Sequence, residues 1–456
     1  MESGRRLRRA IALVAVMAAS GASIAACSSN SATGSTTTTS TGASSLQAST
    51  NGTWPGLGKI CGPGTGAGPT GRGVTAKSVD IATFADPGNS VAPGLNIEFF
   101  QAAAAFSKWC NAAGGINGRQ IVVHNRDAAL FNAAQVTNQA CQEDFMSVGG
   151  GMALDQPSVP VRTACGLGQI TAFTVSNQVV DAPLQVNPGG TNNSIVEAGW
   201  YGALAKRYPA AVKHFGTGAA NNPSILQPTE KWRDAAVAQG YKVVDFQVVP
   251  LTVTDWSPYV EEAQSKGVEA LEPATDSTIT PYVQAMNTAG YSPPFMLLTT
   301  QFYNQATMQA AASTHFPSTY LEMQYWPFEL ASQSSGVRQL EAIMKSGSPG
   351  SPIDFTDEIA FDSWVLFAKA ATACGTDLTT TCVLNHAASE TNWTGGGIAA
   401  PVAHLAYSNQ NPQPSDCFLL MTVQPNKFVY DKGDTDPNQQ IWHCDPKTLY
   451  HVSVAG

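Results

Sequence analysis

The sequence predicts an α/β protein built from two doubly wound lobes, each a parallel sheet with helices on both sides. Residues 79–127 read as a strand, a helix and a second strand, and a similar alternation resumes after residue 194. The chain has 456 residues, whereas a single hydrophobic core rarely grows beyond about 250–300 residues. These observations favour two lobes over one.

Each part of the opening unit has its own pattern. Residues 79–85 alternate as a strand does and stop before Pro87. Apolar residues then recur at steps of three and four from Leu95 to Cys110, which predicts a helix. Glycines at 114–115 end it, because glycine readily takes the positive φ that follows a last helical turn. Residues 120–124 predict the second strand, so the unit implies parallel strands joined by a right-handed crossover.

The end of this unit resembles a known family. Asn111-Ala112-Ala113-Gly114-Gly115-Ile116-Asn117-Gly118-Arg119 is similar to the N-A-x-G-G-I-x-G-R element of the type I solute-binding proteins of ABC importers, the branched-chain amino-acid-binding group. The resemblance covers roughly residues 74–429 in the order of elements. It implies the type I periplasmic binding protein fold, with two Rossmann-like lobes joined by three hinge crossovers. It does not identify a ligand, because the motif ends a helix and turns a chain.

Further alternations extend both lobes. In the first lobe we expect helices at 133–146 and 156–165, strands at 148–151 and 169–173, and a crossover at 182–191. In the second lobe we expect helices at 194–208, 227–239, 259–266 and 280–290, and strands at 212–215, 243–249, 270–272 and 295–298. The remaining third predicts a helix at 357–373 and strands at 320–325, 402–407, 417–423 and 427–430. The N-terminal lobe would comprise residues 61–188 plus about 325–395, and the C-terminal lobe 189–324 plus about 396–456.

The N-terminus predicts export. Arginines precede an apolar stretch at residues 10–19 that is too short to span a bilayer. Ile24-Ala25-Ala26-Cys27 resembles a bacterial lipobox, so residues 1–26 are interpreted as a lipoprotein signal peptide and Cys27 as the acylated residue. The alternative is an ordinary signal peptide cut near Ala26. Residues 27–60 are expected to form a flexible Ser/Thr-rich tether. The folded part would then be lipid-anchored on the outer face of the cell membrane, without a transmembrane helix.

The cysteines predict a structural role. Eight remain besides Cys27, an even number that suggests disulfides in an exported chain. Eight thiols allow 105 pairings, and pairing of neighbours in sequence is the simplest interpretation: Cys61 with Cys110, Cys141 with Cys165, Cys374 with Cys382, and Cys417 with Cys444. No C-x-x-C motif occurs, which argues against a zinc ribbon or a thioredoxin-like site. We expect no metal and no cofactor.

Composition and motifs argue against other classes of function. The formal net charge is −9 and only 12% of residues are charged, so a nucleic-acid partner is not expected. The chain lacks G-x-S-x-G, H-E-x-x-H and P-loop motifs, and its seven histidines are dispersed. An enzyme is therefore not expected, although a triad assembled from scattered residues stays open.

A general rule for open parallel sheets nominates the binding loops. Ligands bind outside the carboxyl ends of the strands, where loops and helix N-termini converge. Two lobes facing each other across this edge would line one cleft. The nominated loops are 86–90, 151–155, 174–178, 216–222, 275–278 and 300–303.

The resemblance assigns roles to some of these loops. In the amino-acid-binding relatives, two first-lobe loops bind the ligand carboxylate, and the matching positions here are Met152-Ala153 and Ser176-Asn177. Second-lobe loops there present a tyrosine and an acid for the ligand ammonium. The matching stretches here read Ala219-Ala220-Asn221-Asn222 and Thr300-Gln301-Phe302-Tyr303, without an acid.

Several candidates keep two interpretations. Asp276 could replace the missing anchor or cap the helix starting near Thr280, and Asp155 could contact a ligand or be a solvated loop acid. Phe302, Tyr303, Tyr325 and Trp326 could wall a pocket or pack in the core. The predicted ligand-binding residues are Met152, Ala153, Asp155, Ser176, Asn177, Asn221, Asn222, Asp276, Gln301 and Phe302.

The function expected from the sequence is a monomeric receptor that closes two lobes on a small polar or amphipathic solute, such as an amino acid, amide or carboxylate. It would present the closed form to an ABC permease. The alternatives are a ligand sensor of the same fold without transport, and an exported hydrolase.

Overall fold

The structure is a computed structural model. It describes residues 48–452 except 67, 69, 276–278 and 434–436. The predicted signal peptide, Cys27, much of the predicted tether and Asp276 lie outside the described residues.

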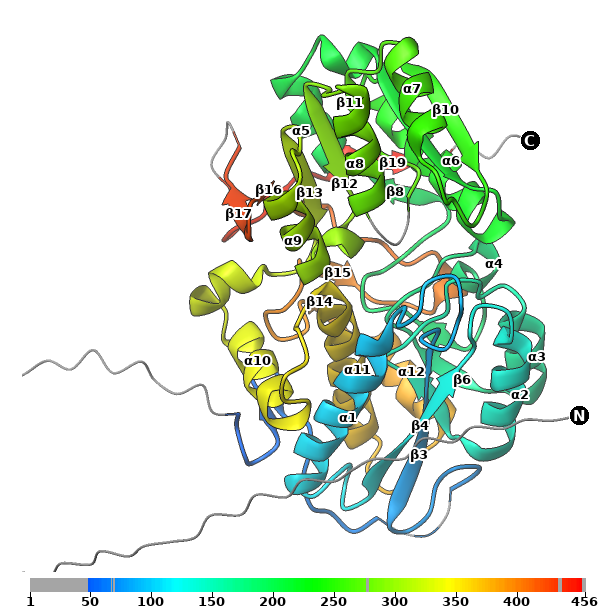
Figure 1. Cartoon of the computed structure of the whole chain (residues 1–456). Coiled ribbons are helices and arrows are strands. Elements are labelled where there is room, and N and C mark those ends of the chain that lie inside the picture. Colours follow the sequence, from blue (N-terminus) through cyan, green and yellow to red (C-terminus); the bar gives the residue numbers. More distant parts are fainter. Residues whose placement is uncertain (1–47, 67, 69, 276–278, 434–436, 453–456) are drawn as a thin grey trace, which may run out of the picture. The chain divides into compact units, whose positions relative to one another are not determined.

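The first sheet has five parallel strands in the order β4-β3-β5-β6-β7 (Figure 1). Its strands are β3 (Ser78–Ala85), β4 (Gln120–Asp127), β5 (Met146–Val148), β6 (Gly168–Ile170) and β7 (Gln185–Val186). The helices between them are α1 (Ile97–Ala112), α2 (Ala133–Glu143), α3 (Ser158–Cys165) and α4 (Asn177–Val180). Strands β3 to β6 are each followed by a helix, as in a doubly wound lobe.

Three helices from much later in the chain complete this lobe: α10 (Ser335–Gly347), α11 (Phe355–Ala373) and α12 (Thr380–Ala388). Both α10 and α11 pack on α1, and α12 packs on α11 and β6. Between α1 and α11, the rings of Phe106 and Trp364 stack with centroids 5.5 Å apart. On another side, α2 packs on α3 and β4.

The N-A-x-G-G-I-x-G-R motif has the expected structural role. Gly114 and Gly115 follow α1 with φ of 113° and 75°. A Cβ atom on Gly115 would lie 2.0 Å from the carbonyl oxygen of Arg119, so no other residue fits this turn.

The second sheet follows the order β10-β9-β11-β12-β13-β16-β17, and β18 pairs with β16. Its strands are β9 (Phe215–Ala220), β10 (Val243–Val249), β11 (Ala270–Leu271), β12 (Phe295–Leu298), β13 (Thr319–Met323), β16 (Cys417–Gln424), β17 (Lys427–Asp431) and β18 (His443–Cys444). Its helices are α5 (Gly199–Arg207), α6 (Pro223–Ala238), α7 (Ser257–Ser265), α8 (Thr280–Ala289) and α9 (Gln305–Ser313). Strands β9 to β13 are parallel, and β16 and β17 join antiparallel.

Smaller elements complete the description. Short pairs are formed by β1 (Thr53–Trp54) with β2 (Gly58–Lys59), β14 (Thr391–Trp393) with β15 (Val402–His404), and β8 (Ile195–Glu197) with β19 (Leu449–His451). Single 3₁₀ turns are η1 (Ala211–Lys213), η2 (Thr300–Phe302), η3 (Phe328–Gln333), η4 (Ser408–Gln410) and η5 (Pro446–Thr448).

The chain passes between the two sheets three times. Residues 187–194 connect β7 to β8, residues 324–334 connect β13 to α10, and residues 405–416 connect β15 to β16. The predicted fold class, two doubly wound lobes joined by three crossovers, is confirmed. Among the residues described, no helix is long and apolar enough to cross a membrane.

Some predicted elements are wrong in position. Residues 211–213 form η1, and the strand placed at 212–215 instead runs from Phe215 to Ala220. Gly216 and Gly218 therefore lie in a strand and not in a binding loop. Small residues are needed there, because a Cβ atom on Gly218 would lie 2.2 Å from the carbonyl oxygen of Gln247 on β10.

Several short strands and four helices were not predicted. Residues 185–186 form β7 inside the expected crossover, and residues 195–197 form β8 where a helix was expected. Both are too short for a visible alternation, since their pairing depends on distant partners. The helices α4, α9, α10 and α12 were also missed, and so were the short strands β1, β2, β14, β18 and β19.

The described part of the chain contains four disulfides, and each joins cysteines that are neighbours in sequence: Cys61–Cys110, Cys141–Cys165, Cys374–Cys382 and Cys417–Cys444.

Candidate functional site

Asp86 organises the first-lobe loops at the carboxyl edge of the sheet. It follows β3 and is fully buried. Its carboxylate accepts hydrogen bonds from the backbone N–H groups of Leu130 at 2.8 Å and Ala153 at 2.7 Å. Burial raises the pKa of Asp86, and these two hydrogen bonds oppose the rise. The backbone N–H of Ala153, a predicted ligand donor, is thus already bonded, and Met152 beside it is buried.

Asp155 has a similar role one loop further on. Its oxygens accept from the backbone N–H groups of Val175 at 2.8 Å and Ser176 at 3.0 Å. Only 3% of it is exposed, so it is not the solvated loop acid that the sequence left open. Burial raises its pKa to about 6. The buried Ser176 caps α4.

Asn177 connects the two lobes. It lies on α4, and its amide donates to Gln227 of α6 at 3.3 Å. Lys231, also on α6, donates to the side-chain oxygens of Asn177 at 2.7 Å and Asn193 at 2.6 Å. Burial lowers the pKa of Lys231. Three polar side chains thus bridge the first-sheet loops and a helix of the second sheet.

The other second-lobe candidates are dispersed. Asn222 caps α6 by accepting from the backbone N–H of Ser224 at 2.9 Å, and Asn221 donates its backbone N–H to Val249. Gln301 is exposed on η2, whereas Phe302 beside it is 3% exposed. These four residues therefore remain predicted ligand contacts.

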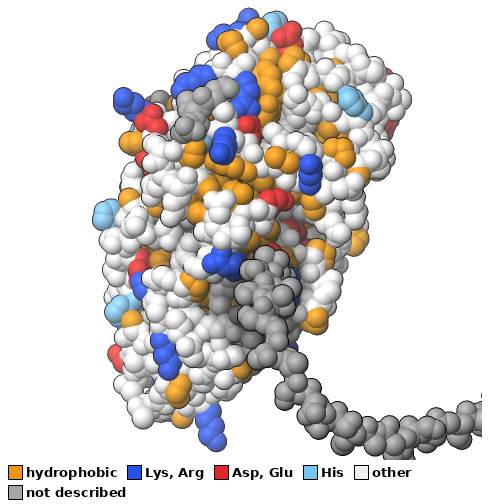
Figure 2. All heavy atoms as spheres, turned by 90° about the vertical axis from the view of Figure 1, so that its left-hand side faces the viewer, with side chains coloured by type: hydrophobic (Ala, Val, Ile, Leu, Met, Phe, Trp, Pro, Cys, Tyr) orange, Lys and Arg blue, Asp and Glu red, His pale blue; other side chains and the backbone are white. Residues whose placement is uncertain are grey.

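A cavity of about 280 Å³, here called the junction pocket, lies where second-sheet and first-lobe segments meet. From the second-sheet side it is lined by Tyr303, Asn304, Gln305, Met308 and Phe428. From the η3 and α10 side it is lined by Phe328, Glu329, Glu341, Pro352 and Ile353. Figure 2 views the side on which α9, α10 and β17 lie in Figure 1, and hydrophobic and acidic side chains gather there beside a hollow.

Tyr303 forms the centre of this pocket. Its hydroxyl donates to Glu329 at 2.6 Å and accepts from the backbone N–H of Phe328 at 2.8 Å. Its ring stacks on Phe328, with centroids 5.9 Å apart, and lies 4.7 Å from the ring of Phe428. Its carbonyl accepts from Phe355, the first residue of α11. Tyr303 is therefore fixed by contacts from several segments.

The sequence predicted only one residue of this pocket. Tyr303 lies in one of the loops expected to bind a ligand, whereas Phe328, Glu329, Glu341 and Phe428 lie outside those loops. A signal for α10 was present, because Ser334 caps a run of apolar residues at helical spacing. No sequence signal places β17 beside it.

Two other aromatic candidates serve packing. Tyr325 and Trp326 are 9% and 5% exposed. The Tyr325 hydroxyl donates to Asp362, and the Trp326 indole donates to the carbonyl of Leu330.

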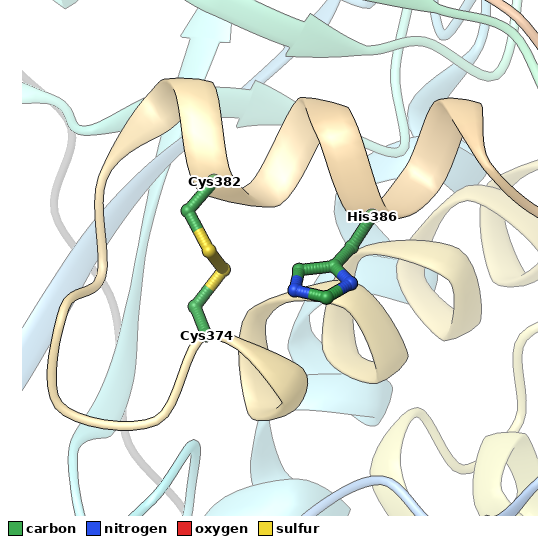
Figure 3. Close-up of side chains that lie close together, drawn as sticks. All are labelled: Cys374, Cys382 and His386. Carbon is green, nitrogen blue, oxygen red and sulfur yellow. A yellow bond between two sulfur atoms is a disulfide. The ribbon is translucent and has the colours of Figure 1, made fainter.

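Within the described residues, two side-chain groups have the proximity that a metal site needs. In the first, Cys374 and Cys382 form a disulfide beside the exposed His386, so no thiolate is available (Figure 3). In the second, His124, Glu143 and Asp144 surround Arg126, whose guanidinium pairs with both carboxylates. Neither group is arranged to ligate a metal.

Comparisons with known proteins agree with the two-lobe architecture. Residues 84–433 match the family described as periplasmic binding proteins. A search of curated proteins found no match.

Three solved structures illustrate the likeness. A fatty acid ABC transporter substrate-binding protein from Thermomonospora curvata has a TM-score of 0.64 at 14% identity, over 82% of this chain and 97% of that chain. An ABC transporter solute-binding protein from R. palustris, in complex with 4-hydroxybenzoate, has a TM-score of 0.62 at 13% identity, over 78% of this chain and 96% of that chain. A branched-chain amino acid transporter substrate-binding protein from Streptococcus pneumoniae, in complex with isoleucine, has a TM-score of 0.60 at 16% identity, over 78% of this chain and 99% of that chain. At such identities the likeness concerns the fold.

Proposed function

The chain belongs to the periplasmic binding protein family, and from this premise we propose that it is an extracytoplasmic receptor that captures a small solute for an ABC importer. The solute would be polar or amphipathic and would bind between an N-terminal lobe, residues 61–188 plus about 325–395, and a C-terminal lobe, residues 189–324 plus about 396–456. The candidate contacts at the sheet edges remain those predicted, with Asn177 and Asn221 as examples.

The bridge of Asn177, Gln227 and Lys231 carries this proposal. These side chains come from α4 and α6, on the two sides of the first crossover, and they bond directly. A solute that touches both lobes favours the closed arrangement by the contacts made only there. The three structural neighbours are a fatty acid transporter's substrate-binding protein and two binding proteins in complex with 4-hydroxybenzoate and isoleucine, and these solutes support a small ligand here.

A solute screen tests the receptor function. The folded chain is heated with amino acids, amides, aromatic carboxylic acids, fatty acids, amines and sugars, and binders are confirmed by calorimetry. A solute at 100 times its Kd should stabilise the protein by about 2.7 kcal/mol, which raises the melting temperature. If no small molecule raises it, the receptor proposal is wrong.

We also propose that Cys27 carries a lipid anchor. The support is its place at the end of a signal-like segment, before a Ser/Thr-rich stretch. A Cys27→Ser chain should move from the membrane fraction to the soluble fraction of the cell envelope, while Ser28→Ala should stay with membranes. A Cys27→Ser chain that stays with the membranes would contradict the anchor.

A further inference from the structure

Charge in the junction pocket has one sign. Glu329 and Glu341 line it, and its lining includes no lysine, arginine or histidine. Glu329 is exposed, accepts from the Tyr303 hydroxyl and has no cationic partner among the described residues. Glu341 lies 3.8 Å from Lys345, whose side chain is 55% exposed. Such a loose surface pair contributes little, so both carboxylates are available to an added cation.

Further carboxyl groups lie in the first turn of α11. Glu358 is fully buried, and neither of its oxygens has a hydrogen-bond partner. One oxygen of the buried Asp357 is also unpartnered. The largest charge interaction on Glu358 is repulsion by Glu329, which connects this group to the pocket. A buried carboxylate without a partner is costly unless it is protonated or meets a positive charge.

The pocket walls suit an organic cation. The ring centroid of Tyr303 lies 5.9 Å from that of Phe328 and 4.7 Å from that of Phe428. Aromatic faces attract ammonium ions at up to about 6 Å from the ring centroid. Met308 and Ile353 add apolar surface for a carbon chain.

A bare metal ion fits less well. A metal site needs several ligand atoms that converge on one point. Among the described residues, only the groups around Cys374 and His124 bring three potential ligand atoms within 4.8 Å. The carboxylates of the junction pocket are not among them.

Building on the proposed receptor function, we propose that the junction pocket binds the positively charged end of an organic ammonium ion. Glu329 and Glu341 are its counter-charges, and Tyr303, Phe328 and Phe428 form its aromatic wall.

A pair of isosteric probes tests the charge requirement. Choline is compared with 3,3-dimethylbutan-1-ol, in which a carbon replaces the ammonium nitrogen, and putrescine is added as a primary diammonium. Calorimetry on the folded full chain should show binding of choline or putrescine, with the neutral alcohol at least about tenfold weaker. Equal affinity for choline and its neutral isostere would overturn the proposal.

Substitutions locate the binding. Glu329→Gln and Glu341→Gln should each weaken binding of the best ammonium probe about tenfold, since each removes one charged partner. Glu261→Gln, on the exposed face of α7, should leave it unchanged. Melting temperatures without probe show that the variants are folded. Unchanged affinity in both pocket variants would overturn the assignment.

The two proposals fail separately. If neutral or anionic solutes bind and no ammonium ion does, the cation assignment falls while the receptor function stands. If no solute of any class binds, the receptor function itself falls.

Discussion

Two sets of buried carboxylates in the first lobe have opposite surroundings. Asp86 and Asp155 each accept two backbone N–H groups at 2.7 to 3.0 Å. Both oxygens of Glu358 and one oxygen of Asp357 accept nothing among the described residues. All four residues are almost fully buried.

The difference in hydrogen bonding distinguishes carboxylates that stabilise the fold from carboxylates that can bind a cation. A carboxylate that accepts two backbone N–H groups fixes two loops, and its desolvation is partly offset. A buried carboxylate without partners fixes nothing and gains most from a cation that arrives later. Asp357 still accepts the backbone N–H of Asp354 through its other oxygen. The comparison therefore predicts that Asp86 and Asp155 stabilise the fold and that Glu358, with neither oxygen bonded, destabilises it.

Replacing Asp86 should have the largest effect. Asp86→Ala leaves the N–H groups of Leu130 and Ala153 unbonded in the interior, which should lower the free energy of unfolding by about 3 kcal/mol. Urea denaturation measures this, with Glu261→Ala as the surface control. A loss below about 0.5 kcal/mol would mean that Asp86 is as dispensable as the acids of α11.

Removing a carboxyl group of α11 should raise the free energy of unfolding instead of lowering it, and the size of the effect should depend on pH. Burial and repulsion raise the folded-state pKa of Glu358 well above its ordinary 4.5, and the pKa of Glu98 rises to about 7. The folded state therefore keeps protons that the unfolded chain releases above about pH 4.5, so stability is fullest below about pH 4.5 and falls as the pH rises through about 7, the pKa of Glu98 on α1.

Glu358→Gln removes one of these titrating groups. It should therefore be more stable than the unsubstituted chain at pH 8, by about 1–2 kcal/mol, and about equal at pH 4.5. Urea denaturation at the two pH values measures the difference. A Glu358→Gln chain that is less stable at pH 8 would show that Glu358 has a stabilising partner.

Lys231 gives the smallest and most specific effect. Lys231→Met removes the contacts to Asn177 and Asn193 but keeps an apolar stem, so the unfolding free energy should change little. The closed arrangement should lose contacts, which we expect to weaken solute binding about fivefold. Lys242→Met, exposed on the same lobe, is the control. Lys231 lies at the sheet edge, whereas Glu329 lines the junction pocket. If Lys231→Met weakened binding of an ammonium probe more than Glu329→Gln does, the assignment of the ammonium site to the junction pocket would be wrong.

Local pattern predicted much of the fold. Strands β10 and β12 match their predicted ranges, and the motif that ends α1 identified the family. These segments are long or strongly periodic, or they contain an unusual turn. Elements that depend on distant partners, such as β7 and β8, were missed or misplaced, because two or three residues carry no period.

The candidate site was predicted less well for a related reason. The rule for parallel sheets found Asn177, which does bridge the lobes, and Tyr303, which lines the junction pocket. It could not find Phe328, Glu341 or Phe428, because they come from three separate segments that meet only after folding. It also could not show that the N–H groups near Ala153 and Ser176 are already occupied by acids.

The order of segments in the two sheets also bears on secretion. The first sheet is covered by α10 to α12, and β19, near the end of the chain, pairs with β8. A partly synthesised polypeptide therefore lacks a layer of one half and the closing ribbon of the other. We expect the nascent protein to stay incompletely folded, and to depend on a chaperone, until β19 has been synthesised.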